Sequence, residues 1–483
     1  MLAKKFSQNF LFQIASQAIG FIASIFVARL GGAAIFGNIG LATSYQNLFR
    51  SLIVNSTNNA HLKIYSEDNE CGIRTYTQLT FLMIVFSDLL IFAWVVYNYF
   101  SFDSSLSTLQ CTLILLFILQ DFITFPCLVA NVDCASKLDI FRANMSSFIP
   151  ALLSNIFKVL AVVLGYREIG IAIFLLIASF FGTFYSIYLL QKNADWGIFR
   201  KDLLKKYIRY TMFIMAGAVA HGLLQSYDKI LLGFLRVSPE DIGYYNAGNK
   251  LGLLFLQIGV SVGGIFLAVF SRNVVQKDND STLDQLKKYE RYVLIFFLPC
   301  IMAVSLLGKD LLMLVFGNDF GRGDGVLIFS LLVALAKIIT VPYHNFLFAH
   351  NRFKSFNILS LFYSAAIVGI TTFFAIVNWF NDILLSIAFG LFLSGIIEKL
   401  LFTYVSKKID SRVKFLYSFP LLFYFLLIFA ASEWILTSFL SQSTFIFRLF
   451  FVLIISGITI LFGFLFGFYK KEDILLIRNL IRI

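Results

Sequence analysis

The fold class of this chain is decided by an apolar run near its start, NFLFQIASQAIGFIASIFVARL, residues 9 to 30. As a helix, a run of this length crosses the hydrocarbon core of a bilayer. It is too long for the core of a signal peptide and has no convincing cleavage site, so we expect it to be retained as the first membrane span. Similar runs follow along the chain, and their length argues against barrel strands, which alternate over about ten residues.

The composition gives the same answer for the whole chain. Its 483 residues are 59% hydrophobic and 14% charged, with a mean hydropathy of +0.83, a balance that soluble globular proteins do not approach. The net charge of +12 does not indicate nucleic-acid binding, because most Lys and Arg lie in short loops between apolar runs. The five cysteines form neither a CxxC pair nor a metal-ligand spacing with histidine. We therefore expect a polytopic helical membrane protein without a metal site, a cofactor or catalytic residues.

Apolar runs bounded by charge, glycine, asparagine or proline define about fourteen spans. We place them at 9–30, 37–60, 76–98, 108–131, 145–165, 169–190, 208–233, 243–270, 291–312, 324–350, 355–378, 382–405, 414–434 and 445–468. With an even number of spans both termini share one side, and the loops of the other side, together with the adjoining span ends, carry only Arg29, Arg167, Arg236, Lys309 and Arg322. Since basic loops stay in the cytoplasm, we predict that both termini are cytoplasmic.

The first six spans resemble the next six. Gly37 and Gly243 open the second and the eighth span, and Pro126 and Pro342 lie in the fourth and the tenth. These matches favour a duplicated six-span unit whose copies point the same way, which gives an all-α fold with two pseudo-symmetric lobes. The predicted domains are the lobes 1–190 and 208–405, the cytoplasmic linker 191–207 between them, and 406–483 with two further helices and a cytoplasmic tail.

Basic side chains lie inside these apolar runs at seven positions: Arg50, Lys158, Lys229, Lys250, Lys337, Lys399 and Arg448. Each costs about 3 kcal/mol near the bilayer centre, so they cannot all face lipid. Three of them lie near span ends, from which a long side chain can extend to the headgroups: Lys229, Lys399 and Arg448. For the other four, a water-filled cavity is as compatible with the sequence as the two alternatives, which are ion pairs between helices and long-range extension of the side chain to the headgroups. The candidates for binding an anionic headgroup are Arg50, Lys250, Lys337, Lys158 and Lys229.

Polar residues recur at steps of three or four on several spans, and therefore lie on one face of each helix. The candidates for lining a cavity are Gln13 and Gln17 in the first span, Asn47 and Asn55 in the second, Gln225 in the seventh, and Asn246, Asn249 and Gln257 in the eighth. Such stripes also serve close helix packing in membranes. Packing does not require a cation on two of the four stripes, so an aqueous cleft that attracts anions is favoured.

Four segments resemble a known family. They are YDKILLGFLRVSPEDIGYYNAGNKL at 227–251, ARLGGAAIFGNIGLA at 28–42, GKDLLMLVFGNDFGRGDGVLI at 308–328 and FAHNRFKSFNIL at 348–359. In this order they resemble segments of the Wzx-type O-antigen and polysaccharide flippases, which are MATE-like exporters of the MOP superfamily. The family often has proline where this chain has Gly32 and Ser271. Because of these two departures, the resemblance does not predict how the two helices bend at Gly32 and Ser271.

The resemblance implies a fourteen-helix carrier in the bacterial inner membrane. Its cargo would be an undecaprenyl-diphosphate-linked oligosaccharide moved from the cytoplasmic to the periplasmic leaflet, for lipopolysaccharide or a related polymer. Implied partners are membrane lipids, a polysaccharide polymerase and a chain-length regulator. No GxxxxGK[ST] loop is present, so H⁺ or Na⁺ is the expected coupling ion. The candidates for coupling are Asp228, which we rank first, and Asp88, Asp121, His221 and Glu398.

Two other functions compete with this one. A multidrug exporter of the same superfamily would carry cationic amphiphiles, and its cleft should be richer in acids than in bases. A polymerase or ligase for lipid-linked sugars would need a sizeable outer loop, whereas the outer loops predicted here are short. No acid, base or nucleophile constellation stands out either. The sequence therefore favours transport over both alternatives.

Overall fold

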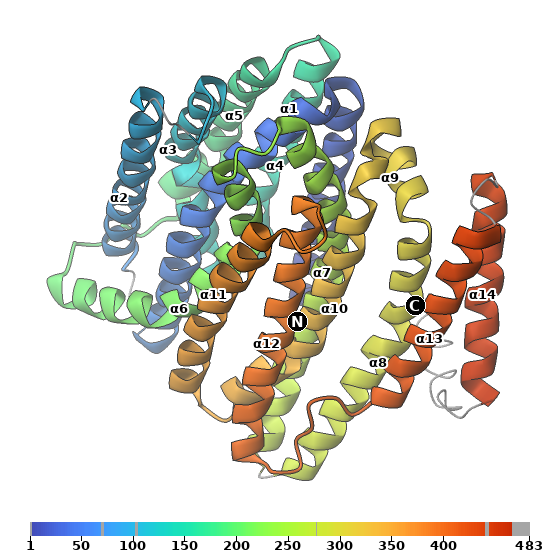
Figure 1. Ribbon diagram of the computed structural model, residues 1–483. Coiled ribbons are helices and arrows are strands. Elements are labelled where there is room, and N and C mark those ends of the chain that lie inside the picture. Colours follow the sequence, from blue (N-terminus) through green and yellow to red (C-terminus); the bar gives the residue numbers. More distant parts are fainter. Residues whose placement is uncertain (1, 69–71, 102–104, 277, 440–443, 466–483) are drawn as a thin grey trace. The chain divides into compact units, whose positions relative to one another are not determined.

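The structure is a computed structural model that describes residues 2–68, 72–101, 105–276, 278–439 and 444–465 (Figure 1). Within these residues the chain forms helices joined by short connections and contains no strand. The helices are α1 (Leu2–Asp68), α2 (Ile73–Phe100), α3 (Thr108–Ser136), α4 (Ile140–Val163), α5 (Glu168–Asn193), α6 (Lys201–Phe234), α7 (Pro239–Val275), α8 (Asn279–Leu306), α9 (Gly308–Phe316), η1 (Asn318–Gly323), α10 (Asp324–Ala349), α11 (Phe353–Val377), α12 (Ile383–Ile409), α13 (Phe419–Phe439) and α14 (Phe445–Leu465). The predicted tail after Leu465 lies outside the described residues.

Helix α1 contains the first two predicted spans. The chain leaves helical geometry at Gly32, where φ is +80° and ψ is 175°. Glycine adopts a positive φ without steric cost, whereas proline fixes φ near −65°. Gly32 therefore breaks the helix at a position where the family often has proline.

The predicted spans correspond to the two parts of α1, to α2 through α8, and to α10 through α14. Ten helices of the described part are long and apolar enough to cross a membrane, with α1 counted once. Helix starts follow from local capping: Ser107 and Gln110 form a capping box at α3, and Asp139 accepts a hydrogen bond from the Arg142 N–H at α4. The prediction of an all-α, multi-pass membrane fold is confirmed.

The described helices form two compact units. Unit 1 lies within residues 1–247, 315–320 and 354–394, and unit 2 within 248–314, 321–353 and 395–483. These boundaries differ from those of the lobes expected from the sequence, which stay a prediction.

Two glycines at equivalent positions of the sequence repeat lie against each other in unit 1. A Cβ atom on Gly37 would be 1.9 Å from the carbonyl oxygen of Pro239, and one on Gly243 would be 2.1 Å from the carbonyl oxygen of Ala33. Each glycine thus faces the carbonyl four residues before the other glycine, as in a two-fold symmetric contact. Only glycine allows the backbones of α1 and α7 to approach this closely.

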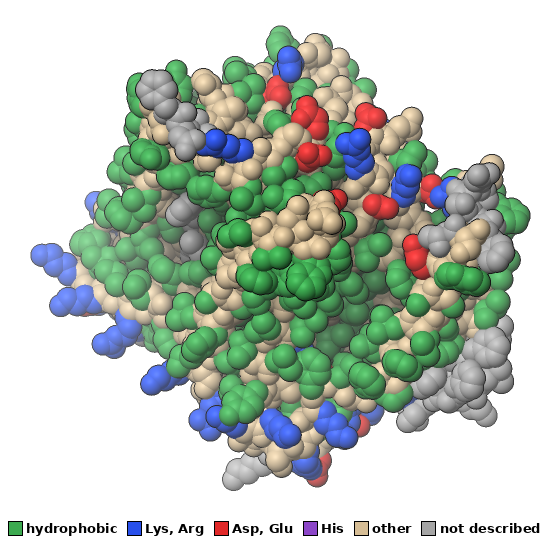
Figure 2. Space-filling view, viewed as in Figure 1, with side chains coloured by type: hydrophobic (Ala, Val, Ile, Leu, Met, Phe, Trp, Pro, Cys, Tyr) green, Lys and Arg blue, Asp and Glu red, His purple; other side chains and the backbone are tan. Residues whose placement is uncertain are grey.

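Large apolar side chains are exposed along the helices. Phe86 is 65% exposed, Phe180 56% and Trp434 63%. Figure 2 shows hydrophobic side chains over most of the visible face, with Lys and Arg at its margins. Such a surface is the one that lipid contact requires, and in water it would be an aggregation liability.

Candidate functional site

Arg50 lies in the second part of α1 and pairs with an acid of α3. Its Nη1 is 2.8 Å from Oδ1 of Asp121, and its Nη2 donates to the hydroxyl of Thr124 at 3.4 Å. The Arg50 side chain is 34% exposed, whereas that of Asp121 is 6% exposed. A guanidinium has five N–H donors, so these two contacts leave it able to bind a further acceptor.

Gln46, one turn before Arg50, holds the acid in place. Its Nε2 donates to Oδ1 of Asp121 at 2.9 Å and to the carbonyl oxygen of Phe117 at 2.9 Å. The carboxylate thus receives donors from two consecutive turns of α1. This arrangement fixes where the Arg50 head lies on the helix surface.

The exposed side of Arg50 faces a cavity of 340 Å³ between α1, α3 and α4. Its polar lining comes from all three helices and consists of Arg50, Asn58, Thr124, Asn131, Ser147 and Ser154. The remaining lining residues are apolar or cysteine, and the described lining includes no Asp or Glu. One cation, two amides and three hydroxyls therefore share a space from which carboxylates are absent.

Hydrogen bonds orient the amides of this cavity. Asn131 donates from Nδ2 to the carbonyl oxygen of Ala143 at 2.7 Å and to Oγ of Ser147 at 2.9 Å. Asn58 accepts from the hydroxyl of Tyr76 at 2.6 Å. With Oδ1 of Asn58 so engaged, its amide N–H₂ is the group left to donate to a ligand.

A proline shapes the α4 wall. Pro150 has no N–H to donate to the carbonyl oxygen of Ser146, one turn earlier. The hydroxyl of Ser186 on α5 donates to that oxygen at 3.3 Å instead. Gly182, one turn before Ser186, allows this approach, because a Cβ there would be 2.7 Å from Cα of Pro150. Helix α5 therefore supports the wall from outside the cavity.

Lys158 continues the polar face of α4. It follows Ser154 by four residues and Ala151 by seven, and both of these line the cavity, so the three share one helix face. The side chain is half-buried, and the described residues offer its ammonium neither an ion pair nor a hydrogen bond. A second cation thus lies one turn beyond the cavity lining.

In unit 2 a second buried cluster joins α10 and α12. Nζ of Lys337 is 2.7 Å from the Glu398 carboxylate, and Nε2 of His344 is 3.3 Å from the same group. Lys337 is 13% exposed and Glu398 3%. One carboxylate is shared by a lysine and a histidine, and little of any of the three groups is accessible.

The next residue of α12, Lys399, belongs to the same cluster. Its Nζ donates to the carbonyl oxygen of Ile339 at 3.1 Å, lies 3.4 Å from the ring centre of Tyr343 and is 4.0 Å from Glu290. Glu290 also accepts from the backbone N–H groups of Tyr417 at 2.5 Å and Ser418 at 2.9 Å. Cation, aromatic ring and carboxylate are therefore fixed together.

The expectation that three cations extend to the headgroups is wrong. Lys399 is 4% exposed within the cluster just described, and Lys229 donates to the carbonyl oxygen of Gln225 and lies 3.4 Å from Asp228. Arg448 pairs with Asp310 at 3.0 Å. Each has an acceptor close enough to replace the headgroup, which nearness to a span end does not reveal.

The other predicted residues differ in their burial and in their contact partners. Asp121 is the partner of Arg50, Glu398 that of Lys337, and Asp228 is wholly buried beside Lys229. Asp88 and Asn249 are buried, Asn55, Lys250, Gln17 and Gln257 are half-buried, and Gln13, Asn47 and His221 are exposed. His221 contacts Gln225 at 3.0 Å, and Asn246 donates to the carbonyl oxygen of Phe36 at 3.4 Å. Their roles in binding or coupling stay predictions.

Several residues of these clusters were not predicted from the sequence: Gln46, Thr124, Asn131, Ser147, Ser154, Glu290 and His344. Most are small or neutral and occur in apolar runs, where they do not stand out. A signal for α4 exists, because Ser147, Ser154 and Lys158 recur at helical spacing. Glu290 falls just before the span predicted at 291–312, so it is not among the acids that lie inside predicted spans.

Comparisons with known proteins identify the family and the fold of the chain. A family model described as "Polysaccharide biosynthesis protein" matches residues 26–322, which is more than half of the chain. No curated protein matches the chain. Among solved structures, the lipid II flippase MurJ in an inward closed conformation is similar with a TM-score of 0.75 and 16% identity, over 94% of this chain and 98% of that one.

Two transporters of the MOP superfamily are also similar. An inward-facing multidrug resistance MATE family transporter has a TM-score of 0.60 and 12% identity, over 83% of this chain and 96% of its own. A MOP superfamily transporter from Pyrococcus furiosus, with a binding pocket described as of reverse polarity, has a TM-score of 0.54 and 13% identity, over 85% and 95%. At these identities the likeness concerns the fold.

Proposed function

The chain belongs to the polysaccharide biosynthesis protein family and is a multi-pass membrane transporter with the fold of the MOP superfamily, and we propose that its cargo is an undecaprenyl-diphosphate-linked oligosaccharide. The protein acts as a flippase in the bacterial inner membrane, with both termini in the cytoplasm. It delivers the lipid-linked unit to the periplasmic leaflet, where a polymerase and a chain-length regulator use it.

One observation carries this proposal: the cavity of unit 1 contains Arg50 and has no carboxylate in its described lining. An arginine binds phosphate oxygens through paired N–H donors, and its charge is weakly hydrated compared with that of lysine. Asp121 accepts from one edge of the guanidinium, and 34% of the Arg50 side chain stays exposed. The cavity is therefore suited to an anion.

The neutral part of the lining suits a sugar. Amides and hydroxyls, which here come from Asn58, Asn131, Ser147 and Ser154, donate to and accept from sugar hydroxyls. The cavity is small for a ligand site, since such sites span about 300 to 1,000 Å³. It holds the phosphate end with an adjoining sugar, while the prenyl chain stays in lipid.

The competing functions fit these residues less well. A drug exporter of the same fold would hold a cationic amphiphile, and Arg50 repels one. The polymerase and ligase alternatives need a reactive constellation, and the lining residues that the structure describes include neither a carboxylate nor a histidine. An anionic cargo that is moved without being cleaved agrees with both points.

Movement of the cargo is coupled to H⁺ or Na⁺ in this proposal. The cation at the cavity has a carboxylate partner, Asp121, and Asp88 is buried on the neighbouring helix α2. Buried acids of this kind are where intramembrane ion coupling takes place. Lys158, one turn beyond the cavity on α4, receives the phosphate once it leaves Arg50.

The test replaces Arg50 and measures surface polysaccharide in cells that depend on this chain. Arg50→Ala should reduce polysaccharide export at least tenfold, because a charge-assisted contact to the cargo is lost. The control is Arg448→Ala, which removes an arginine of similar exposure from another ion pair, with Asp310. Both variants are checked for equal amounts in the membrane. Wild-type export by Arg50→Ala, or equal losses in both variants, would contradict the proposal.

A further inference from the structure

A second polar pocket lies at the end of α12. It has a volume of 440 Å³ and is formed by the last turns of α12 with the loop that follows. Lys407, Arg412 and Lys414 contribute three basic side chains, and Thr403 contributes a hydroxyl. No residue of the Arg50 cavity takes part, so this pocket is separate from the proposed transport site.

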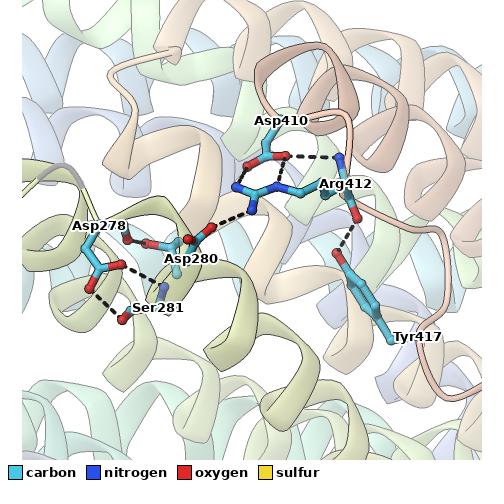
Figure 3. A network of polar contacts seen from close by, with 7 residues as sticks. Asp278, Asp280, Ser281, Asp410, Arg412 and Tyr417 are labelled. Carbon is cyan, nitrogen blue, oxygen red and sulfur yellow. Dashed lines mark hydrogen bonds and ion pairs between the residues drawn. The ribbon is translucent and has the colours of Figure 1, made fainter.

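The loop that closes the pocket is held rigidly by Arg412. Figure 3 shows its guanidinium between two carboxylates: it donates to Asp410 at 2.9 and 3.1 Å, and it also pairs with Asp280 on α8. The backbone N–H of Arg412 donates to Asp410 as well, and its carbonyl oxygen accepts from the hydroxyl of Tyr417 at 3.3 Å. Asp410 and Asp280 therefore neutralise the charge of Arg412, and these contacts position the loop.

The same loop is fastened to the buried cluster of unit 2. The hydroxyl of Tyr343 donates to the carbonyl oxygen of Lys414 at 2.8 Å, and Glu290 accepts from the N–H groups of Tyr417 and Ser418. Val413, between these anchors, is 1% exposed. Both walls of the pocket are therefore fixed before any ligand arrives, which lowers the entropic cost of binding.

Two lysines and one hydroxyl of the pocket are left without partners. Within the described residues, the ammonium groups of Lys407 and Lys414 make neither an ion pair nor a hydrogen bond. The hydroxyl of Thr403 is buried, has no hydrogen-bond partner there, and its residue is 6% exposed. A buried unsatisfied hydroxyl is costly, so a ligand that accepts a hydrogen bond from Thr403 would remove this cost.

The rim of the pocket is apolar and exposed. Leu400 is 49% exposed, Tyr404 61% and Phe415 41%, and the ammonium of Lys408 lies 4.6 Å from the ring centre of Tyr404. Aromatic side chains at a span end are characteristic of the headgroup level of a bilayer. A ligand with an anionic part and an adjoining hydrocarbon part matches both the floor and the rim.

We propose that this pocket binds the phosphate of an anionic membrane phospholipid, with Lys407 and Lys414 on the phosphate oxygens and Thr403 donating its hydroxyl. The acyl chains lie along Leu400, Tyr404 and Phe415. Basic pockets between spans on the cytoplasmic side commonly bind such headgroups. Because the loop is anchored to Glu290 and Tyr343, the bound lipid stabilises the buried cluster of unit 2.

The first test compares phosphatidylglycerol with phosphatidylcholine on the purified full-length protein. Native mass spectrometry counts bound lipids, and the unfolding temperature is measured with each lipid. In Lys407→Gln/Lys414→Gln we expect about 30-fold weaker phosphatidylglycerol binding, from a factor of about five per lysine. The matched control is Arg352→Gln/Lys354→Gln, the same charge change at the start of α11, which is also on the predicted cytoplasmic side. Unchanged binding in the first variant, or an equal loss in the control, overturns the proposal.

Thr403→Val separates ligand binding from folding. Without phosphatidylglycerol its unfolding temperature should equal or exceed that of the wild type, because an unsatisfied hydroxyl is removed. The stabilisation by phosphatidylglycerol should shrink. If Thr403→Val unfolds at a lower temperature in phosphatidylcholine and keeps the full phosphatidylglycerol effect, the hydroxyl has a structural role and the proposal fails.

A third arm distinguishes a lipid from free phosphate. Millimolar inorganic phosphate is added to the protein in phosphatidylcholine, and phosphatidylglycerol is then titrated. We expect no stabilisation by phosphate and no competition, because the apolar rim contributes to lipid binding. Stabilisation by phosphate equal to that by phosphatidylglycerol would show that the ligand is a soluble anion and that the lipid assignment is wrong.

Discussion

Arg50 in unit 1 and Lys337 in unit 2 have the same kind of partner and different surroundings. Each is a cation inside a predicted span, and each lies 2.7 to 2.8 Å from a carboxylate on another helix. Arg50 is 34% exposed and lines a cavity of 340 Å³, whereas Lys337 is 13% exposed and shares Glu398 with His344. An intramembrane ion pair therefore does not identify a binding site by itself; what matters is the part of the cation that the pair leaves accessible.

The two pairs also differ in their donors. A lysine ammonium concentrates its charge on one atom, and the ammonium of Lys337 lies 2.7 Å from a buried acid in a side chain that is only 13% exposed. The guanidinium spreads its charge over a plane, so one edge can hold Asp121 and another can hold a ligand. This is why we assign cargo binding to unit 1 and a structural role to the cluster of unit 2.

The largest expected effect comes from breaking the pair in unit 2. Glu398→Gln leaves Lys337 buried without a counter-charge, which should lower the free energy of unfolding by about 3 kcal/mol or more. The double variant Lys337→Met/Glu398→Leu should recover most of that loss, since apolar side chains replace both charges. Thermal unfolding of the purified proteins measures both. If Glu398→Gln is as stable as the wild type, the cluster does not carry charge in the folded state and the contrast with Arg50 disappears.

The matched change in unit 1 should cost less and affect transport more. Asp121→Asn removes the counter-charge of Arg50, but a side chain that is 34% exposed can be hydrated, so we expect a loss of about 1 kcal/mol. Without Asp121, Arg50 attracts an anion more strongly, so the lipid-linked cargo should bind more tightly and be released more slowly. Native mass spectrometry of bound cargo and surface polysaccharide measure the two effects. A stability loss as large as that of Glu398→Gln, with cargo binding unchanged, would remove the distinction.

Much of the fold was accessible from the sequence because hydropathy is a local property. The span predicted at 169–190 is α5 (Glu168–Asn193), and that at 208–233 is α6 (Lys201–Phe234). The sequence repeat identified Gly37 and Gly243 as equivalent positions, and the two residues lie in contact in the structure. Only the position of each helix along the chain was needed for these predictions, and no knowledge of its neighbours.

The site was accessible only in part, because it depends on which helices meet. Arg50 and Asp121 were both candidates, but nothing in the sequence joined two residues that are 71 positions apart. Lys399 was expected to extend to the headgroups, and it is buried because Glu290 and Tyr343, on other helices, provide its partners. Glu398 and Lys399 point about 100° apart on α12, so both can be buried only if α12 is covered on two faces. Hydropathy does not report such coverage.

The smallest effect concerns the ion pair of Asp410 and Arg412 in unit 2, in which the arginine side chain is 56% exposed and the aspartate side chain 11% exposed. The hydrogen bonds from Arg412 hold the pKa of Asp410 below its ordinary value of 3.8. A carboxyl whose pKa is lower in the folded state stabilises the fold above its unfolded pKa, and that contribution is lost as the pH falls through the folded pKa. The unfolding temperature should therefore decline between about pH 5 and pH 3, and Asp410→Asn should reduce the slope.

Asp278 contributes a slope of the same sign, because the hydroxyl and the backbone N–H of Ser281 lower its pKa. Asp410→Asn should thus remove only part of the pH dependence, and Asp278→Asn/Asp410→Asn should remove more. Near pH 7 the loss in Asp410→Asn should be small, because the arginine of the pair is 56% exposed, so solvent and salt screen its charge. The free energy of unfolding at pH 7 could instead fall in Asp410→Asn by as much as in Glu398→Gln. In that case the exposure of the cation does not determine how much an ion pair stabilises this protein, contrary to the contrast between Arg50 and Lys337.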